Sequence, residues 1–242
     1  MILTSEERAS LLDVLGVDVL VECQLNDRIR HMKAENFIKE ILMGDLGASY
    51  VVVGEDNRFG FERKGTPELL VEFGRKYGFD VEILSKEMDG HRKISSTYIR
   101  EELKKGNMEK VTTLMGRDYF VEGQVVHGRG MGHKVLLPTT NIIPSKEKLM
   151  PPNGVYDTVS HFKDRTLYGI TNVGYKPTIG EKFLGVETYL FDCEEDLYGE
   201  PCKVEFLHYS RPEKRFSSIE ALKQQLLKDA EKGKTYFKNL KK

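Results

Sequence analysis

Apolar residues in the first half of the chain alternate between a helical and a strand-like spacing. A capping box of Thr4 and Glu7 precedes the first helical stretch, and short apolar runs typical of buried strands follow the helical stretches. The pattern predicts, in chain order, a helix over residues 4–16, a strand over 17–21, a helix that carries Phe37, Ile38, Ile41 and Leu42, a strand over 49–54, a helix over 66–79, a strand over 80–84 and helical structure over 97–115. Helices and strands that alternate at this pace favour crossover connections and a parallel sheet.

After about Asp118 the pattern changes to short strands separated by glycine, proline and asparagine. The strand-like stretches are YFVEGQVVHG, NGVYDTVSHF, TLYGITNVGY, VETYLFD and CKVEFLHY. Strands at this regular spacing favour a small antiparallel barrel or sandwich. A capping box of Ser217 and Glu220, followed by an apolar stripe, predicts one long helix at the end. We therefore expect an α/β domain over residues 1–117 and a β domain over residues 118–242.

Composition limits the classes to which the protein can belong. The chain has 242 residues, of which 39% are hydrophobic and 31% charged, and this suits soluble domains with buried cores. Its longest apolar runs are too short to span a bilayer, and its three cysteines lack the paired spacing of a disulfide framework or a zinc site. We expect a cytoplasmic protein without a membrane partner. Because the formal net charge is −1, the chain has no general attraction to nucleic acid, and any recognition of anions must be local.

One candidate for such local recognition is the glycine-rich part of the stretch HGRGMGHKVLLPTTN. Glycines allow backbone N–H groups to approach a phosphate closely, and the basic residues among them would add positive charge. The candidate residues are Gly128, Gly130, Gly132 and His133. The same glycines can equally form a hairpin that binds nothing.

A Pro-Thr-Thr-Asn turn is predicted directly after these glycines. Thr139 and Asn141 can place a hydroxyl and an amide oxygen on one side of this turn. Oxygen ligands of this kind suit Mg²⁺ that bridges nucleotide phosphates. Threonine and asparagine are also ordinary turn residues, whose side chains often satisfy only local backbone groups.

A carboxylate on a predicted strand is the third candidate. In GVETYLFD, the alternation of a strand puts Glu187 on the face that carries Tyr189, while Val186, Thr188 and Leu190 share the other face. A carboxylate on a defined face can act as a general base toward a hydroxyl. The alternative is a surface carboxylate paired with a lysine. The nearby stretch TNVGYKPTIG is interpreted as a second loop, which either folds over a ligand or merely connects strands.

Taken in order, these stretches resemble the riboflavin kinase module of prokaryotic bifunctional riboflavin kinase/FMN adenylyltransferases. The match runs from about Tyr119 to the C-terminus through GQVVHGRGMGHKVLLPTTNI, PPNGVY, TNVGYKPTIG, VETYLFD, DLYGE and VEFLHYSRPEKRF. The resemblance implies a six-stranded antiparallel β-barrel with a C-terminal helix, and a kinase that converts riboflavin and ATP into FMN and ADP. It also implies that Thr139 and Asn141 hold Mg²⁺ and the ATP phosphates, that the glycine loop with His133 covers the nucleotide, and that Glu187 is the catalytic base.

The sequence departs from this family immediately before and within the turn. The family usually has Gly-Phe ahead of Pro-Thr-Ala-Asn, whereas this chain has Leu136 and Leu137 there and Thr140 in place of alanine. Because Thr139 and Asn141 are retained, we expect the metal site to persist and the affinity for the nucleotide to change. A flavin- or nucleotide-binding regulator without catalysis is the alternative that these departures leave open.

The first half resembles the FMN adenylyltransferase module of the same enzymes, a Rossmann-like nucleotidylyltransferase domain. The matching stretches are LTSEERASLLDVLGVDVLV, VVVGEDNRFGFERKGT and ISSTYIREELKKGNMEKVTTLMGR. The resemblance implies that Ser95, Ser96, Thr97 and Arg100 contact the ATP triphosphate, although the first three can also simply cap the next helix. The His-x-Gly-His motif of the complete module does not occur in the sequence. We therefore expect a partial domain in which adenylyltransferase activity is absent or much reduced; the alternative is a fragment of the bifunctional enzyme that also makes FAD.

A doubly wound sheet without its first strand would expose the edges of the neighbouring strands. We therefore expect residues 1–117 to be less stable than residues 118–242, or to associate into a homo-oligomer. Limited proteolysis of the purified chain should degrade the first half before the second. Equal resistance of the two halves would contradict this prediction.

Overall fold

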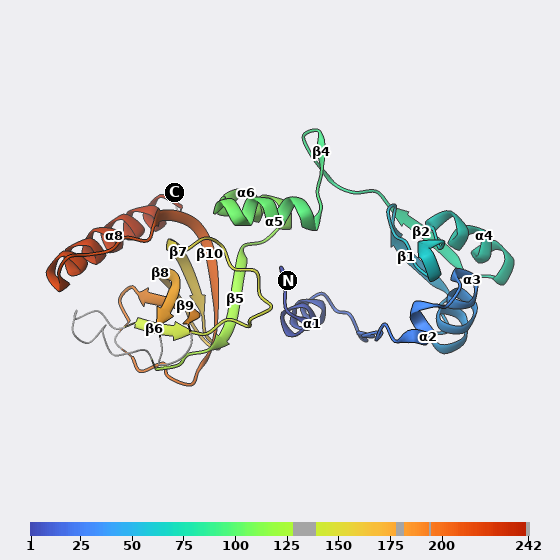
Figure 1. Ribbon diagram of the computed structural model, residues 1–242, viewed down its shortest axis with the longest axis horizontal. Coiled ribbons are helices and arrows are strands. Elements are labelled where there is room, and N and C mark those ends of the chain that lie inside the picture. The colour runs from blue at the N-terminus through green and yellow to red at the C-terminus, as the bar shows by residue number, and fades with distance from the viewer. Residues whose placement is uncertain (128–138, 178–181, 194, 241–242) are drawn as a thin grey trace. The chain divides into compact units, whose positions relative to one another are not determined.

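The computed structural model describes residues 1–127, 139–177, 182–193 and 195–240 (Figure 1). The chain divides into two compact units. One unit combines Met1–Leu15 with Ser96–Lys242, and the other consists of Gly16–Ser95. The first helix therefore belongs to the same unit as the second half of the chain, although about a third of the sequence lies between them.

The smaller unit contains a two-stranded parallel sheet. Strand β1 (Tyr50–Gly54) pairs with β2 (Asp80–Leu84), and helix α4 (Pro67–Tyr77) lies between them in the chain. Thr66 caps α4 through its side chain, and Gly78 ends the helix in the left-handed conformation that glycine adopts without strain. The predicted parallel pair with a helical crossover is confirmed.

Short elements complete the smaller unit. Its core consists of Ile38, Leu70, Phe73 and Phe79. The helix predicted around Ile38 exists, but most of it has π-helical hydrogen bonding. The short elements are α2 (Asp27–Arg30), α3 (Ala34–Asn36), the π-helix η1 (Phe37–Asp45), the 3-10 helix η2 (Phe61–Arg63), and the hairpin of β3 (Met88–Asp89) and β4 (Arg92–Lys93).

The strand predicted over residues 17–21 is wrong, because this segment has no regular secondary structure. Its apolar side chains are exposed, Val19 at 73% and Val21 at 59%. An apolar run predicts a buried strand only if a neighbouring strand supplies partners for its backbone groups. Within the described residues of this unit, β1 and β2 pair with each other and not with this segment.

The larger unit is built on six antiparallel strands. They are β5 (Tyr119–Gln124), β6 (Thr139–Ile142), β7 (Gly154–His161), β8 (Thr166–Pro177), β9 (Lys182–Leu190) and β10 (Pro201–Pro212). Their order in the sheet is β5-β10-β7-β8-β9-β6. Just beyond β5, the Val126 backbone nitrogen donates to the carbonyl oxygen of Asn141 in β6 at 2.8 Å. This bond joins the two edges of the sheet, so the predicted six-stranded antiparallel barrel is confirmed.

Helix α8 (Ile219–Leu240) lies along one side of this sheet (Figure 1). The Phe237 ring packs 4.6 Å from Tyr168 and 6.2 Å from Phe191, measured between ring centroids. The predicted capping box of Ser217 and Glu220 is wrong by one residue. The Ser218 hydroxyl accepts the hydrogen bond from the backbone nitrogen of Ala221 at 3.1 Å.

Three further helices belong to the larger unit. They are α1 (Ser5–Val14), α5 (Ser96–Lys105) and α6 (Met108–Met115). The capping box predicted for α1 is confirmed, because the Thr4 nitrogen donates to the Glu7 carboxylate at 2.8 Å and the Glu7 nitrogen donates to the Thr4 hydroxyl at 3.2 Å. Gly106, with a φ of +77°, separates α5 from α6.

A buried carboxylate lies in β7, close to α8. Asp157 is only 3% exposed, and the Ser210 hydroxyl donates to its Oδ2 at 2.7 Å. Its Oδ1 has no hydrogen-bond partner among the described residues. Burial raises the pKa of Asp157 above the ordinary value. Because the folded state holds this proton more tightly than the unfolded chain, the stability that the neutral form provides is lost as the pH rises through the folded-state pKa.

Replacing Asp157 by asparagine exchanges the buried carboxyl group for an amide that cannot ionise. We expect Asp157→Asn to unfold at a higher temperature than the wild type at neutral pH, with a gain on the order of 1 kcal/mol. The gain should shrink as the pH falls below the folded-state pKa, since the wild-type carboxyl group is then neutral as well. Calorimetric unfolding across this pH range measures both effects. The control is Asp192→Asn at an exposed ion pair, and a variant less stable than wild type at neutral pH would contradict the prediction.

Candidate active site

The two residues predicted to hold a metal ion lie on a strand. Thr139 and Asn141 belong to β6, so the predicted Pro-Thr-Thr-Asn turn is wrong for these positions. They are alternate residues of one strand, and their side chains therefore share a face. A hydroxyl and an amide oxygen are thus placed side by side by strand geometry.

Glu187 lies beside these residues on β9. Glu187 is the register partner of Asn141 on one side and of Asn172 in β8 on the other. The Thr139 hydroxyl donates to Glu187 Oε1 at 3.0 Å. Thr139, Asn141, Glu187 and Asn172, which we call the polar row, therefore come together from three neighbouring strands.

The alternation predicted for β9 agrees with the packing. Val186 and Leu190 are buried in the core of the barrel. Tyr189 packs instead into the cluster beneath α8 together with Phe191 and Phe237. Glu187 is therefore on the outward face of the strand, next to the region that α8 covers.

A line of threonine hydroxyls on the inward face supports the polar row. The Thr171 hydroxyl lies 2.7 Å from that of Thr158 and 2.8 Å from that of Thr188, and all three side chains are buried. The Thr140 hydroxyl donates to the carbonyl oxygen of Thr188 at 3.4 Å. Because these bonds join β7, β8, β9 and β6, they fix the register of the strands that carry the polar row. Thr140, which departs from the family pattern, is therefore accommodated as a buried, hydrogen-bonded residue of the barrel.

The donor set of the polar row suits a metal ion that arrives with a phosphorylated substrate. The Thr139 hydroxyl donates a hydrogen bond to Glu187, so the lone pairs of the Thr139 oxygen point elsewhere and can bind a metal ion. Asn141 adds an amide oxygen. Two neutral oxygens with one nearby carboxylate fit Mg²⁺, which usually takes its other ligands from phosphate groups and water.

The predicted glycine loop lies outside the described residues, and so do the two departures before the turn. The residues concerned are Gly128, Gly130, Gly132, His133, Leu136 and Leu137. Directly before this loop, the His127 ring stacks on Tyr198 with 3.7 Å between ring centroids. Tyr198 belongs to the DLYGE stretch, and sequence reasoning assigned it no contact.

The candidate triphosphate-binding residues lie together at the start of α5. Ser95 precedes the helix, while Ser96, Thr97 and Arg100 are exposed on its first turns. Further along α5, Leu103 is buried in the hydrophobic core of the larger unit. The exposed side chains at the start of α5 are thus accessible to a ligand.

The stretch interpreted as a second loop is largely a strand, since residues 171–177 belong to β8. This correction places Asn172 opposite Glu187, a position that sequence reasoning did not identify. Nearby, the Asn153 amide donates to Glu213 Oε2 at 3.1 Å, and the other Glu213 oxygen lies so close to Gly174 that a side chain there would collide with it. The signal for this arrangement was the alternation of TLYGITNVGY, which already predicted a strand.

Family models match both halves of the chain. The model described as riboflavin kinase matches residues 115–237, and the model described as FAD synthetase matches residues 1–98. The barrel that carries the polar row is therefore a riboflavin kinase domain.

Relatives extend this match over almost the whole chain. The bifunctional riboflavin kinase/FMN adenylyltransferase of Bacillus subtilis is 32% identical over 98% of this chain and 75% of its own length. The Escherichia coli K12 protein of the same name is 33% identical over 96% of this chain and 74% of its own length. The chain belongs to the family of bifunctional riboflavin kinase/FMN adenylyltransferases.

A solved structure from Streptococcus pneumoniae, described as a macrolide-efflux protein, superposes with a TM-score of 0.84. It is 29% identical and covers 94% of this chain and 73% of its own. In the described residues of the present chain, none of the helices has the length and apolar character needed to cross a bilayer.

The threonine line provides a test of what holds the polar row in place. Thr171→Val keeps the shape of the side chain but leaves the hydroxyls of Thr158 and Thr188 without their shared partner. We expect the free energy of unfolding to fall by about 1–3 kcal/mol, measured by urea denaturation. Thr171→Ser retains the hydroxyl and serves as the control. A valine variant at least as stable as the serine variant would contradict this role.

Proposed function

We propose that this chain transfers the γ-phosphoryl group of ATP to the terminal ribityl hydroxyl of riboflavin, forming FMN and ADP. The observation that carries the proposal is the 3.0 Å contact between the Thr139 hydroxyl and Glu187 Oε1. It joins a candidate metal ligand and a candidate base on neighbouring strands of a riboflavin kinase domain.

In the proposed reaction, Glu187 accepts the proton of the ribityl hydroxyl as its oxygen forms a bond to the γ-phosphorus. The bond from that phosphorus to the bridging oxygen of ADP breaks at the same time. Thr139 and Asn141 would hold Mg²⁺, which supplies neutralisation of phosphate charge. Phosphoryl transfer asks a protein mainly for positioning and charge neutralisation, and a rigid strand pair provides the first of these.

The remaining roles follow from the family. Gly128, Gly130, Gly132 and His133 would cover the nucleotide. By resemblance, residues 118–242 would correspond to the kinase module and residues 1–117 to the adenylyltransferase module, while α1, α5 and α6 of the first half fold in the same compact unit as the barrel. ATP is the co-substrate that the riboflavin kinase family implies. Since the reaction consumes ATP, we place it in the cytoplasm.

We further propose that this chain makes little or no FAD. The sequence contains no His-x-Gly-His motif, and in the proposal Ser95, Ser96, Thr97 and Arg100 are remnants of an ATP site. The second candidate function is the full bifunctional activity, which the match of residues 1–98 to the FAD synthetase model favours. A non-catalytic regulator is the third.

Association into a homo-oligomer through the first half stays a prediction. Large apolar side chains are exposed on the smaller unit, among them Val19, Val21, Tyr50 and Val52. Exposed apolar surface of this kind favours contact with another chain. Sedimentation of the purified protein over a range of concentrations measures this directly.

The purified chain should convert riboflavin to FMN when it is incubated with ATP and Mg²⁺, and chromatography separates the flavins. Glu187→Gln should lower kcat by about 10²–10⁴-fold, because the base is lost while the shape of the side chain is kept. Glu205→Gln, at a carboxylate of β10 that contacts His161 at 2.7 Å, is the control and should retain activity.

Three other outcomes would count against parts of the proposal. Full turnover by Glu187→Gln would remove the assigned base. Formation of FAD together with FMN would overturn the proposal for residues 1–117. Binding of riboflavin without any FMN would favour the regulator.

A further inference from the structure

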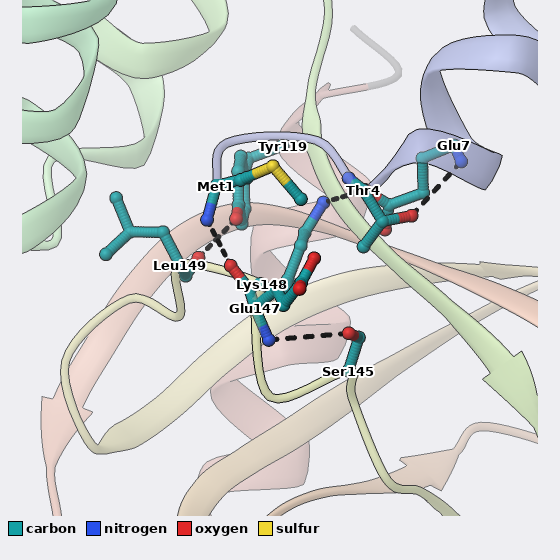
Figure 2. A network of polar contacts seen from close by, with 8 residues as sticks. All are labelled: Met1, Thr4, Glu7, Tyr119, Ser145, Glu147, Lys148 and Leu149. Atoms are coloured by element: carbon teal, nitrogen blue, oxygen red, sulfur yellow. Dashed lines mark hydrogen bonds and ion pairs between the residues drawn. The ribbon is translucent and has the colours of Figure 1, made fainter. Parts of the chain in front are cut away.

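A second polar network, outside the polar row, is buried between α1 and the barrel (Figure 2). Lys148 Nζ lies 2.5 Å from Glu7 Oε2, and the two side chains are only 1% and 5% exposed. The Lys148 ammonium also lies 4.6 Å from the centroid of the Tyr119 ring and 4.9 Å from that of Phe120. The cation is thus enclosed by one carboxylate and two aromatic faces.

Backbone bonds strengthen this contact (Figure 2). The Leu149 nitrogen donates to the carbonyl oxygen of Met1 at 2.7 Å, and the Met1 nitrogen donates to the carbonyl oxygen of Glu147. The Tyr119 hydroxyl donates to the carbonyl oxygen of Leu149. Two kinds of contact therefore join the N-terminal residues to the segment around Lys148. Main-chain bonds link Met1 to Glu147 and Leu149, and a side-chain ion pair links Glu7 to Lys148.

The attachment of α1 to the barrel depends on both members of the buried ion pair. Desolvation lowers the pKa of Lys148, and the hydrogen bond that its ammonium group donates to the Glu7 carboxylate opposes that effect. A buried ion pair adds little stability compared with apolar packing, but removal of one partner leaves the other charge buried without compensation. Loss of either Glu7 or Lys148 should therefore weaken the attachment of α1 to the barrel.

The segment that α1 holds is the direct continuation of β6. Lys148 follows Asn141 by seven residues, and Ile142 between them is buried in the barrel core. Strand β6 has four residues and lies at the edge of the sheet, where it pairs with β9. On its other side, the bridge between Val126 and Asn141 joins it to the extension of β5. A short edge strand of this kind depends on whatever fixes the chain at its ends.

We propose that α1 is a positioning element for the metal-binding strand, and that the pair of Glu7 and Lys148 sets the affinity of the kinase site for the Mg²⁺ complex of ATP. The inference rests on the proposed function, which supplies the roles of Thr139 and Asn141. Glu7 lies in the region matched by the FAD synthetase model and Lys148 in that matched by the riboflavin kinase model. The contact therefore makes nucleotide binding by the kinase domain depend on a helix of the neighbouring family region.

The test compares two variants with controls from the same two segments. Glu7→Gln and Lys148→Met each break the pair. Glu6→Gln and Lys146→Met make the same changes at exposed neighbouring positions and leave the pair intact. Each protein is analysed well below its own unfolding midpoint, and Glu7→Asp, which withdraws the carboxylate by one methylene, replaces a variant that does not fold.

Two measurements are made on every variant. Hydrogen exchange followed by mass spectrometry reports the protection of residues 139–153 without any substrate. Titration calorimetry with ADP and Mg²⁺ gives the dissociation constant of the nucleotide, and the kinase assay separates KM for ATP from kcat. We expect faster exchange over residues 139–142 in both pair variants, a dissociation constant and a KM for ATP raised roughly three- to thirtyfold, and kcat close to that of the wild type.

Unchanged exchange over residues 139–142, or an unchanged dissociation constant, in folded pair variants would overturn the proposal. Equal effects in the exposed controls would also overturn it, since general loss of charge would then explain the result. A wild-type chain that forms no FMN would instead refute the proposed function, and the exchange experiment would still test whether α1 holds β6.

Discussion

The pairing of β6 with β9 is the interaction on which the candidate site depends. Its register places Asn141 opposite Glu187, and the same register brings the Thr139 hydroxyl within 3.0 Å of the Glu187 carboxylate. A shift by one residue would turn both β6 side chains to the other face of the strand. Hydrogen bonds inside the barrel help to fix this register, because the hydroxyls of Thr158, Thr171 and Thr188 join the strands beneath the polar row.

Much of this architecture could be predicted from residue patterns. The alternation around Glu187 correctly assigned its face, and the capping box of Thr4 and Glu7 correctly marked the start of α1. Both are local signals, in which a few neighbouring residues determine the outcome. The position of Asn172 could not be predicted in the same way, because its proximity to Glu187 depends on how β8 and β9 pair across a connection.

The wrong predictions also have physical reasons. Pro, Thr and Asn favour turns locally, but Thr139 and Asn141 form a strand because β9 supplies backbone partners to them. Residues 17–21 show the opposite case, since an apolar run without a paired neighbour stays irregular. The ion pair of Glu7 and Lys148 joins residues 141 positions apart, and no sequence pattern relates them.

The division of the chain has a topological consequence. Because α1 and Ser96 belong to the same compact unit, Gly16–Ser95 is an insertion into that unit and not a domain attached at one end. An insertion is covalently joined to the larger unit at both of its ends, whereas an appended domain is joined at one. A single break in the chain within residues 16–95 would leave two pieces, and the buried contact of α1 with the barrel would still hold the shorter piece in place.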